Sequence, residues 1–323
     1  MTMTARCHIL ALSLMVLLLC SCTHKDLDFG DQASVTVRFD WSSYPDVSPE
    51  MTRVAVFNES AQPVFFPFTG CQGGAVNLYK GYTYDFIGYN SDTEYLFTSG
   101  SAYSDFLFCC MPTELATFSP MFAPRRAGDA SAPRAPGTES YEVVAEPDPL
   151  WYATAQNVEI RGNQMIDMPM RSAICHYTFT VRDVENLSNV VNIVATVSGM
   201  SQSFNPSEGR CTDTYCIIPF NMYSDEETHE LHGTLRSFGY YSTPQDEADA
   251  SKMLVIYVEL GDGRKLYYTF DVSEPINAAG SNPGSTEVEI ALEKLPIPKP
   301  FYNGSGLHPS VDGWQEVEIG IEL

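Results

Sequence analysis

The stretch SVTVRFDW at Ser34–Trp41 alternates apolar and polar side chains with a period of two. Successive side chains of a β-strand point to opposite faces, so Val35, Val37 and Phe39 fall together on one face. An alternation of this kind predicts a half-buried strand. The pattern returns in YTYDFIGYN at 82–90, AICHYTFTV at 173–181 and EVEIGIEL at 316–323. The sequence therefore predicts a protein built mainly from β-strands.

Turn signals and further apolar runs support an all-β fold. GDGR at 261–264 lies between MLVIYVEL at 253–260 and KLYYTFDV at 265–272, which is a strong hairpin signal. Helical periodicity is scarce, and only SEPINAAG at 273–280 is expected to form a short helical turn. Strands bounded by Gly, Pro, Asn and Asp turns favour a β-sandwich architecture.

The length of 323 residues predicts more than one domain. Residues 123–149 are rich in Ala and Pro and poor in large apolar residues, which is typical of an interdomain linker or a long loop. We place the boundary after Met170. This gives an N-terminal β-sandwich domain at 34–170, with 123–149 as its loop, and a C-terminal β-sandwich domain at 171–323. A boundary inside 123–149 is the alternative, and no internal repeat is visible by sequence identity.

The first residues have the composition of an export signal. Arg6 precedes an apolar run at 9–19 that is too short to span a bilayer as a helix, and small residues follow it. The sequence LLLCSCTHKDLD at 17–28 resembles the lipobox of bacterial lipoproteins, with Cys22 at the acylated position. We expect a lipoprotein signal peptide at 1–21 and a lipidated tether at 22–33, which anchors the chain to a membrane without spanning it. An ordinary signal with incidental cysteines is the alternative.

Charge and motifs argue against several classes of function. The net charge of −23 at pH 7 repels phosphate backbones, so we expect no nucleic-acid partner. The sequence has no Gly-x-Ser-x-Gly elbow, no phosphate-binding glycine loop and no His-Glu-x-x-His motif. His229 and His232 lie among acidic residues, but residues three apart fall on opposite faces of a strand. We therefore expect a solvated acidic loop there, and we predict no enzyme activity, no cofactor and no metal.

Six cysteines follow the expected lipid site. Their spacings match no zinc pattern and no compact disulfide scaffold, although an exported protein can keep disulfides. Cys211 and Cys216 could close a small loop across a turn, and buried free thiols are the competing interpretation. Both interpretations stay open at this point. The six residues are Cys71, Cys109, Cys110, Cys175, Cys211 and Cys216.

Several segments together resemble a known group of proteins. They are HKDL at 24–27, VRFDW at 37–41, GYTYDFIGYNSDTE at 81–94, FDVSEPI at 270–276 and GLHPSVDGWQEVEIGIEL at 306–323. The group is that of uncharacterised Bacteroidales-type outer-membrane lipoproteins, which look related to fimbrillins and minor-fimbrium anchor proteins. The resemblance implies two tandem transthyretin-like (Greek-key) β-sandwich domains, and a role as fimbrial anchor, accessory subunit or surface adhesin. Those families have no catalytic residues to carry over, and only Cys22 transfers.

The resemblance also implies a location and partners. Lys25–Asp28 is loosely similar to a surface-export signal, so we expect display on the outer membrane rather than a periplasm-facing anchor. Fimbrial subunits of this type are cut after an arginine, which makes Arg125 and Arg126 a candidate proteolytic site, with Arg134 a further one. Solvated loop arginines are the alternative, and an uncleaved anchor or accessory subunit is expected. The alternating Val317–Leu323 could add to the sheet edge of another fimbrial subunit, although a terminal strand more often completes its own sheet.

Glycan binding is the alternative function, in which the chain captures host or dietary polysaccharides at the cell surface. SFGYYST at 237–243 places Phe238, Tyr240 and Tyr241 in a loop-like setting, and KPFYNGSG at 299–306 adds two more rings. An aromatic ring offers an apolar face, and tyrosine adds a polar handle. The competing interpretation is that these rings cap the ends of the sandwich core.

Overall fold

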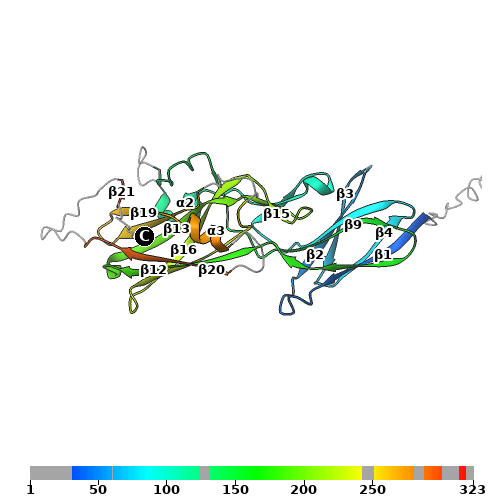
Figure 1. The fold of residues 1–323 in the computed structure, drawn as a ribbon, viewed down its shortest axis with the longest axis horizontal. Helices are drawn as coiled ribbons and strands as arrows, with labels where there is room; N and C mark the ends of the chain where they lie inside the picture. Colours follow the sequence, from blue (N-terminus) through cyan, green and yellow to red (C-terminus); the bar gives the residue numbers. More distant parts are fainter. Residues whose placement is uncertain are drawn as a thin grey trace, which may run out of the picture.

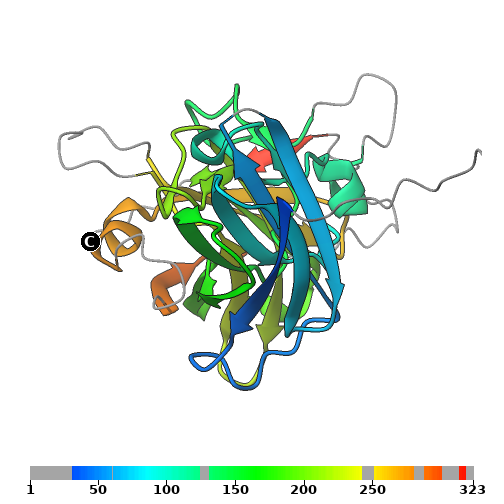
Figure 2. The same cartoon turned by 90° about the vertical axis from the view of Figure 1, so that its right-hand side faces the viewer.

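The protein is described by a computed structural model, which covers residues 31–59, 61–123, 131–241, 251–279, 287–299 and 313–317. Figure 1 shows an elongated molecule with two lobes along its long axis. In the view along that axis the N-terminal lobe, in blue and cyan, lies in front of the C-terminal lobe (Figure 2). The expectation of a mostly β protein is confirmed, because strands form four sheets within the described residues.

The N-terminal lobe consists of a three-stranded and a five-stranded sheet packed face to face. The first has the order β10-β1-β4 and the second the order β11-β9-β5-β2-β3. Phe39 of β1 lies 6.3 Å from Phe68 of β3, measured between ring centroids, which joins the two layers. The bounds are β1 Gln32–Asp40, β2 Met51–Asn58, β3 Ala61–Thr69, β4 Gly73–Tyr79, β5 Thr83–Asn90, β9 Trp151–Glu159, β10 Gln164–Pro169 and β11 Arg171–Ser172.

The alternating stretch at Ser34–Trp41 lies mostly in β1. Val35, Val37 and Phe39 are buried between the two sheets, while the residues between them are exposed or partly exposed. The central strands of the five-stranded sheet, β2 and β5, differ because both of their faces are covered. Val54 of β2 faces the core of the lobe, and its neighbour Ala55 is equally buried on the opposite face. Near-continuous apolar runs in β2 and β5 follow from this double burial.

The C-terminal lobe is built around one continuous run of strands. Its order is β20-β12-β17-β16-β13-β18-β19-β21, with β8 beside β16. β16 pairs with β13 up to Asn221 and with β17 from Met222 onward, so it carries the chain from one layer to the other. The bounds are β8 Glu142–Val143, β12 Cys175–Val184, β13 Val190–Ser201, β16 Tyr215–Asp225, β17 Glu230–Ser237, β18 Met253–Leu260, β19 Lys265–Asp271, β20 Glu287–Leu295 and β21 Trp314–Glu316.

The two lobes repeat one topology that sequence identity did not reveal. In each lobe the first strand has a parallel and an antiparallel neighbour: β10 and β4 flank β1, and β20 and β17 flank β12. In the opposite layer of the N-terminal lobe, β2 pairs with β3 and β5, and β5 also pairs with β9. In the opposite layer of the C-terminal lobe, β13 pairs with β16 and β18, and β18 also pairs with β19. The two sets of strands are therefore connected in the same order.

Short helices and the chain end complete the C-terminal lobe. The expected turn at 273–280 is confirmed as α3, Ser273–Ala279. The segment at 316–323 is described only at its start, where β21 pairs in parallel with β19 and the amide of Val317 donates to the Tyr267 carbonyl at 3.1 Å. Elsewhere in the described residues the helical turns are η2 Tyr103–Asp105, α2 Leu115–Phe118, η3 Pro120–Phe122 and η4 Leu187–Asn189.

Two inserted hairpins join the lobes. β6 (Leu96–Ser99) and β7 (Leu107–Cys110) lie between β5 and β9 in the chain, and β14 (Ser203–Asn205) and β15 (Arg210–Cys211) lie between β13 and β16. They form a four-stranded sheet of order β15-β14-β7-β6, in which Phe204 is paired with Phe108. One buried apolar cluster includes residues of both lobes. The domain boundary after Met170 stays a prediction, and strand pairing crosses it here.

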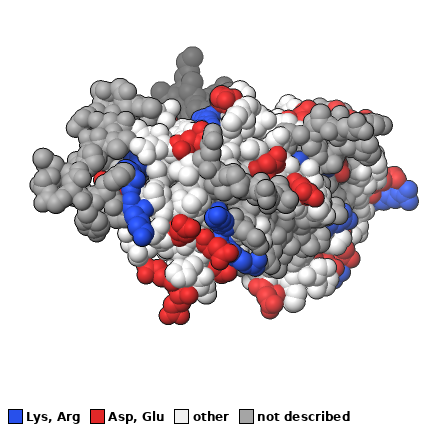
Figure 3. All heavy atoms as spheres, turned by 60° about the vertical axis from the view of Figure 1, so that its left-hand side comes forward, with Lys and Arg blue, Asp and Glu red and all other residues white. Residues whose placement is uncertain are grey.

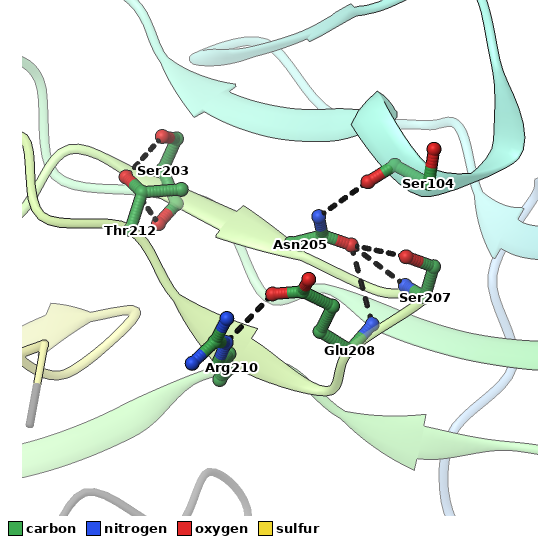
Figure 4. A network of polar contacts seen from close by, with 7 residues as sticks. All are labelled: Ser104, Ser203, Asn205, Ser207, Glu208, Arg210 and Thr212. Atoms are coloured by element: carbon green, nitrogen blue, oxygen red, sulfur yellow. Dashed lines mark hydrogen bonds and ion pairs between the residues drawn. The ribbon is translucent and has the colours of Figure 1, made fainter. Parts of the chain in front are cut away.

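Polar contacts reinforce this junction (Figure 4). The Asn205 side-chain oxygen accepts from the Ser207 amide at 2.9 Å and the Ser207 hydroxyl at 2.7 Å, which closes the turn between β14 and β15. The side-chain amide of Asn205 donates to the carbonyl of Ser104, in the N-terminal hairpin, at 2.9 Å. A single residue thus shapes its own turn and bonds to the other lobe.

The described part of the Pro/Ala-rich stretch lies against the C-terminal lobe. Ala135 of the stretch, and Phe122 just before it, pack with Val255 and Tyr257 of β18. The Tyr257 hydroxyl donates to the Pro133 carbonyl at 2.6 Å. The first described part of this stretch therefore contacts the second lobe, although it belongs to the N-terminal half of the sequence. Its last residues also contact that half, since the Asp148 carboxylate accepts from the amides of Glu94 and Tyr95 at 2.7 Å.

Candidate binding groove in the N-terminal lobe

The residues singled out in the sequence fall into two groups. Cys22, Arg125 and Arg126 lie outside the described residues, as do the rings in KPFYNGSG. Phe238 and Tyr240 are buried, and Tyr241 is partly exposed.

Phe238 and Tyr240 have core partners rather than a free face. The ring of Phe238 stacks on Phe204 at 6.0 Å. The Tyr240 hydroxyl donates to the Asn277 carbonyl at 3.3 Å, and the Lys252 ammonium lies 4.2 Å from the centroid of its ring. Neither ring is presented to a ligand, so their position does not support the glycan-contact prediction.

The six cysteines are all present as free thiols in the described residues. Cys175 and Cys211 both direct their sulfur at the Phe238 carbonyl, at 3.8 Å and 2.9 Å. Burial raises the pKa of Cys175 to about 11 and that of Cys211 to about 12. Thiols held protonated in this way are poor nucleophiles, so the cluster is part of the core rather than a reactive centre.

No group of three or more His, Cys, Asp or Glu side chains is placed to hold a metal ion within the part that the structure describes. His232 stacks on Tyr223 at 5.3 Å, and its Nε2 lies 3.3 Å from a carboxylate oxygen of Glu230. Among the described helices, none has the length and apolar character needed to cross a bilayer.

A groove opens between β3 and β4, the edge strands of the two sheets of the N-terminal lobe. Val64 of β3 is paired with the buried Val56, so its side chain faces the space between the sheets. Nevertheless 52% of Val64 is exposed. The three-stranded sheet ends at β4 and is narrower than the five-stranded sheet opposite, which leaves this inner face uncovered. The resulting cavity has a volume of about 400 Å³.

The β3–β4 groove has an apolar floor and a polar, aromatic rim. Val56, Val64, Phe66 and Leu78 supply the floor. The other lining residues are polar or aromatic: Asn58, Gln62, Asn77, Tyr79 and Tyr82, together with the buried Tyr84. Binding pockets for small ligands are mostly lined by apolar side chains, with a few polar groups that fix the orientation of the ligand. The lining of this groove has the same character.

Two tyrosines dominate the rim. Tyr79 ends β4 and Tyr82 follows the Lys80–Gly81 turn, so the turn brings the two rings together at 6.4 Å. Tyr79 is 54% exposed and Tyr82 is 56% exposed. Burial raises the pKa of Tyr84, whose hydroxyl also interacts with the Asn58 side chain. The local signal was present in the sequence as YKGYTY, with tyrosines on both sides of a Lys-Gly turn.

The electrostatics of the groove differ from those of the molecule. None of the described residues that line the groove is charged. Acidic and basic side chains are instead spread over the surface, as the face in Figure 3 shows for the C-terminal side. In a chain with a net charge of −23, the groove is therefore a neutral, aromatic site.

Comparison with known proteins places the chain in a family. The model of a domain of unknown function, DUF5119, matches residues 21–221. The chain belongs to the DUF5119 family. No curated protein matches it.

Solved structures share the fold at low sequence identity. A candidate adhesin from Bacteroides ovatus is 19% identical, and the alignment covers 87% of this chain and 99% of that one with a TM-score of 0.59. The fimbrial anchor protein Mfa2 from Porphyromonas gingivalis is 13% identical, with 81% and 90% covered and a TM-score of 0.48. At these identities the first likeness shows a shared fold, and the second is too distant to support an argument.

Proposed function

We propose that this DUF5119 protein is a lipid-anchored, non-catalytic protein of the cell envelope, acting as a fimbrial anchor or accessory subunit or as a surface adhesin. The observation that carries the proposal is the fold shared with the Bacteroides ovatus candidate adhesin over almost the whole of both chains. We further infer that the repeated topology represents two transthyretin-like domains, since the first strand of each lobe pairs in parallel with a strand near the end of that lobe, β1 with β10 and β12 with β20.

The arrangement of the lobes fits attachment at the N-terminus. β1 begins at the outer end of the N-terminal lobe, farthest from the C-terminal lobe (Figure 1). A tether at Cys22 would hold that end near the membrane and direct the other lobe outward. The chain would then reach partners beyond the membrane surface, on the outer membrane of the cell, without a segment that spans the bilayer.

The experiment compares Cys22→Ser with Cys20→Ser in the native host. The proposal expects the parent and Cys20→Ser to fractionate with the outer membrane and to be digested when intact cells are treated with protease. Cys22→Ser should lose the lipid by mass spectrometry and leave the membrane fraction. A parent chain that carries an unmodified N-terminus would refute lipid anchoring, and full protection from protease would refute surface display.

The alternative function is capture of glycans by a surface lipoprotein. The β3–β4 groove favours it, because its lining combines exposed tyrosine rings with side-chain amides. Pull-down from envelope extracts separates the two functions: fimbrial subunits on the parent chain support assembly, and their absence together with glycan binding supports capture.

A further inference from the structure

Three strongly exposed apolar or aromatic side chains of the N-terminal lobe meet at the β3–β4 groove. Val64, Tyr79 and Tyr82 are each more than half exposed, and all three line the β3–β4 groove. Burial of apolar accessible surface stabilises a protein by about 25 cal/mol for each Å², and exposed side chains of this kind do not provide that stabilisation. Exposed apolar patches in folded proteins commonly mark binding sites. The groove therefore has the character of a surface kept open for a ligand.

The β3 edge is poorly suited to adding a peptide strand. β3 contains Pro63 and Pro67, and proline has no amide hydrogen to donate to a neighbouring strand. Proline on an edge strand is one of the ways in which proteins prevent edge-to-edge pairing. This argues that recognition in the groove uses side chains rather than a backbone ladder.

The chemistry of the lining selects a neutral, polar ligand with apolar faces. Charged side chains are absent from the described lining, so an ionic ligand would find no counter-charge there. An anionic ligand would in addition be repelled by the strongly acidic molecule. Gln62 and Asn77 are exposed at the rim and offer both donors and acceptors. The two tyrosine rings offer flat apolar surfaces with hydroxyl groups at their ends.

A sugar ring combines these properties. Its C–H faces pack on aromatic rings, its hydroxyls exchange hydrogen bonds with amides, and an unsubstituted hexose carries no charge. We propose that the β3–β4 groove binds a neutral oligosaccharide, with Tyr79 and Tyr82 stacking on sugar rings and with Gln62 and Asn77 bonding to hydroxyls. This assignment rests on the surface-binding function proposed above, and it specifies the ligand class at a defined site.

The test uses the detergent-solubilised full chain and a panel of named probes. The neutral probes are maltoheptaose, xylohexaose, laminarihexaose and chitohexaose, and the acidic probes are heparin and polysialic acid. A synthetic peptide of residues 314–323 represents strand docking. Binding is measured by isothermal titration calorimetry for the parent, Tyr82→Ala and Tyr223→Ala. Tyr223 is an exposed tyrosine on β16 in the other lobe, so its removal is the matched control.

The proposal expects at least one neutral oligosaccharide to bind, with a loss of about tenfold in affinity for Tyr82→Ala and no change for Tyr223→Ala. Both variants should have the same melting temperature as the parent, which would show that the loss of affinity comes from the groove rather than from misfolding. Binding only to the acidic probes, only to the peptide, or equally to Tyr82→Ala overturns the assignment, and so does silence on all neutral probes.

The outcomes separate this assignment from the proposed function. If neutral glycans fail to bind while the parent chain remains on the cell surface, only the groove assignment falls. If a neutral glycan binds through Tyr82 while the chain proves to be unlipidated and absent from the envelope, the anchoring function falls and the groove stands.

Discussion

Phe204→Ala tests whether the two lobes form one cooperative unit. Phe204 lies on β14 and is fully buried. Its ring centroid is 5.1 Å from that of Tyr152 in the N-terminal lobe and 6.0 Å from that of Phe238 in the C-terminal lobe. The ring thus packs against aromatic residues of both lobes, so its removal should weaken the junction.

The expected cost follows from the size of the side chain removed. Replacing a buried phenylalanine by alanine costs about 3–5 kcal/mol, because apolar burial is lost and the surrounding core only partly fills the cavity. The total stability of a folded domain is about 5–15 kcal/mol. The substitution therefore removes a large share of the free energy of unfolding.

The three tryptophans allow the lobes to be followed separately in urea. Trp41 and Trp151 lie 6.2 Å apart in the N-terminal lobe, and Trp314 lies 5.3 Å from Tyr257 in the C-terminal lobe. Trp314→Phe leaves fluorescence from the first lobe, and the double Trp41→Phe, Trp151→Phe variant leaves fluorescence from the second. The parent background should give coincident transitions, and Phe204→Ala should give two separate ones at lower urea.

Phe97→Ala is the control, because Phe97 lies on β6 of the same four-stranded sheet but is exposed. Its loss should cost less than about 1 kcal/mol and should leave the transitions coincident. Separate transitions already in the parent background would refute the shared core. A cost below about 1 kcal/mol for Phe204→Ala would refute the argument from burial.

Three further outcomes are expected. Asn205→Asp keeps the turn acceptor but places an oxygen against the Ser104 carbonyl, so it should cost about 1–3 kcal/mol in urea unfolding, and an unchanged midpoint would contradict the interlobe bond. His229→Gly should raise stability by about 1 kcal/mol, measured as melting temperature, since His229 has a φ of 59° that favours glycine; a lower melting temperature would argue against backbone strain there. The raised pKa values of Cys175 and Cys211 give stability that is fully present below about pH 9 and is lost as the pH rises through about 11 to 12. Urea midpoints of the reduced protein at pH 8 and pH 10.5 should show that fall, and a flat profile would show that the thiols contribute nothing.

Local pattern predicted the strands but not how they assemble. The alternation at Val35–Phe39 is sufficient to identify β1, because one buried face leaves a period of two. The repeat of topology is invisible to identity, since pairing such as that of Val35 with Gln164 joins residues far apart in sequence. Many different side chains satisfy the same pairing, so two lobes can share an order of strands without sharing a sequence.

The candidate groove shows the same limit. Phe238 and Tyr240 lie in a loop-like sequence but belong to the buried apolar cluster that includes residues of both lobes. The two lobes are joined there by the pairing of two hairpins that are far apart in the sequence. The β3–β4 groove arises because the two sheets differ in width, and a short stretch of sequence carries no information about the width of a sheet. The tyrosines of YKGYTY marked a turn with rings on both sides, and only the neighbouring edge of β3 makes that turn the rim of a site.

The position of β1 determines how the molecule responds when it is pulled. β1 is bonded to β10 on one side and to β4 on the other, and it is the first strand after the expected tether. Tension applied at residue 31 along this strand slides it past both neighbours, so hydrogen bonds on two edges must break together. Strands that are peeled from an edge give way one bond at a time. Force that reaches the folded part through its N-terminal end is thus borne first by β1, with the hydrogen bonds on both of its edges sharing the load.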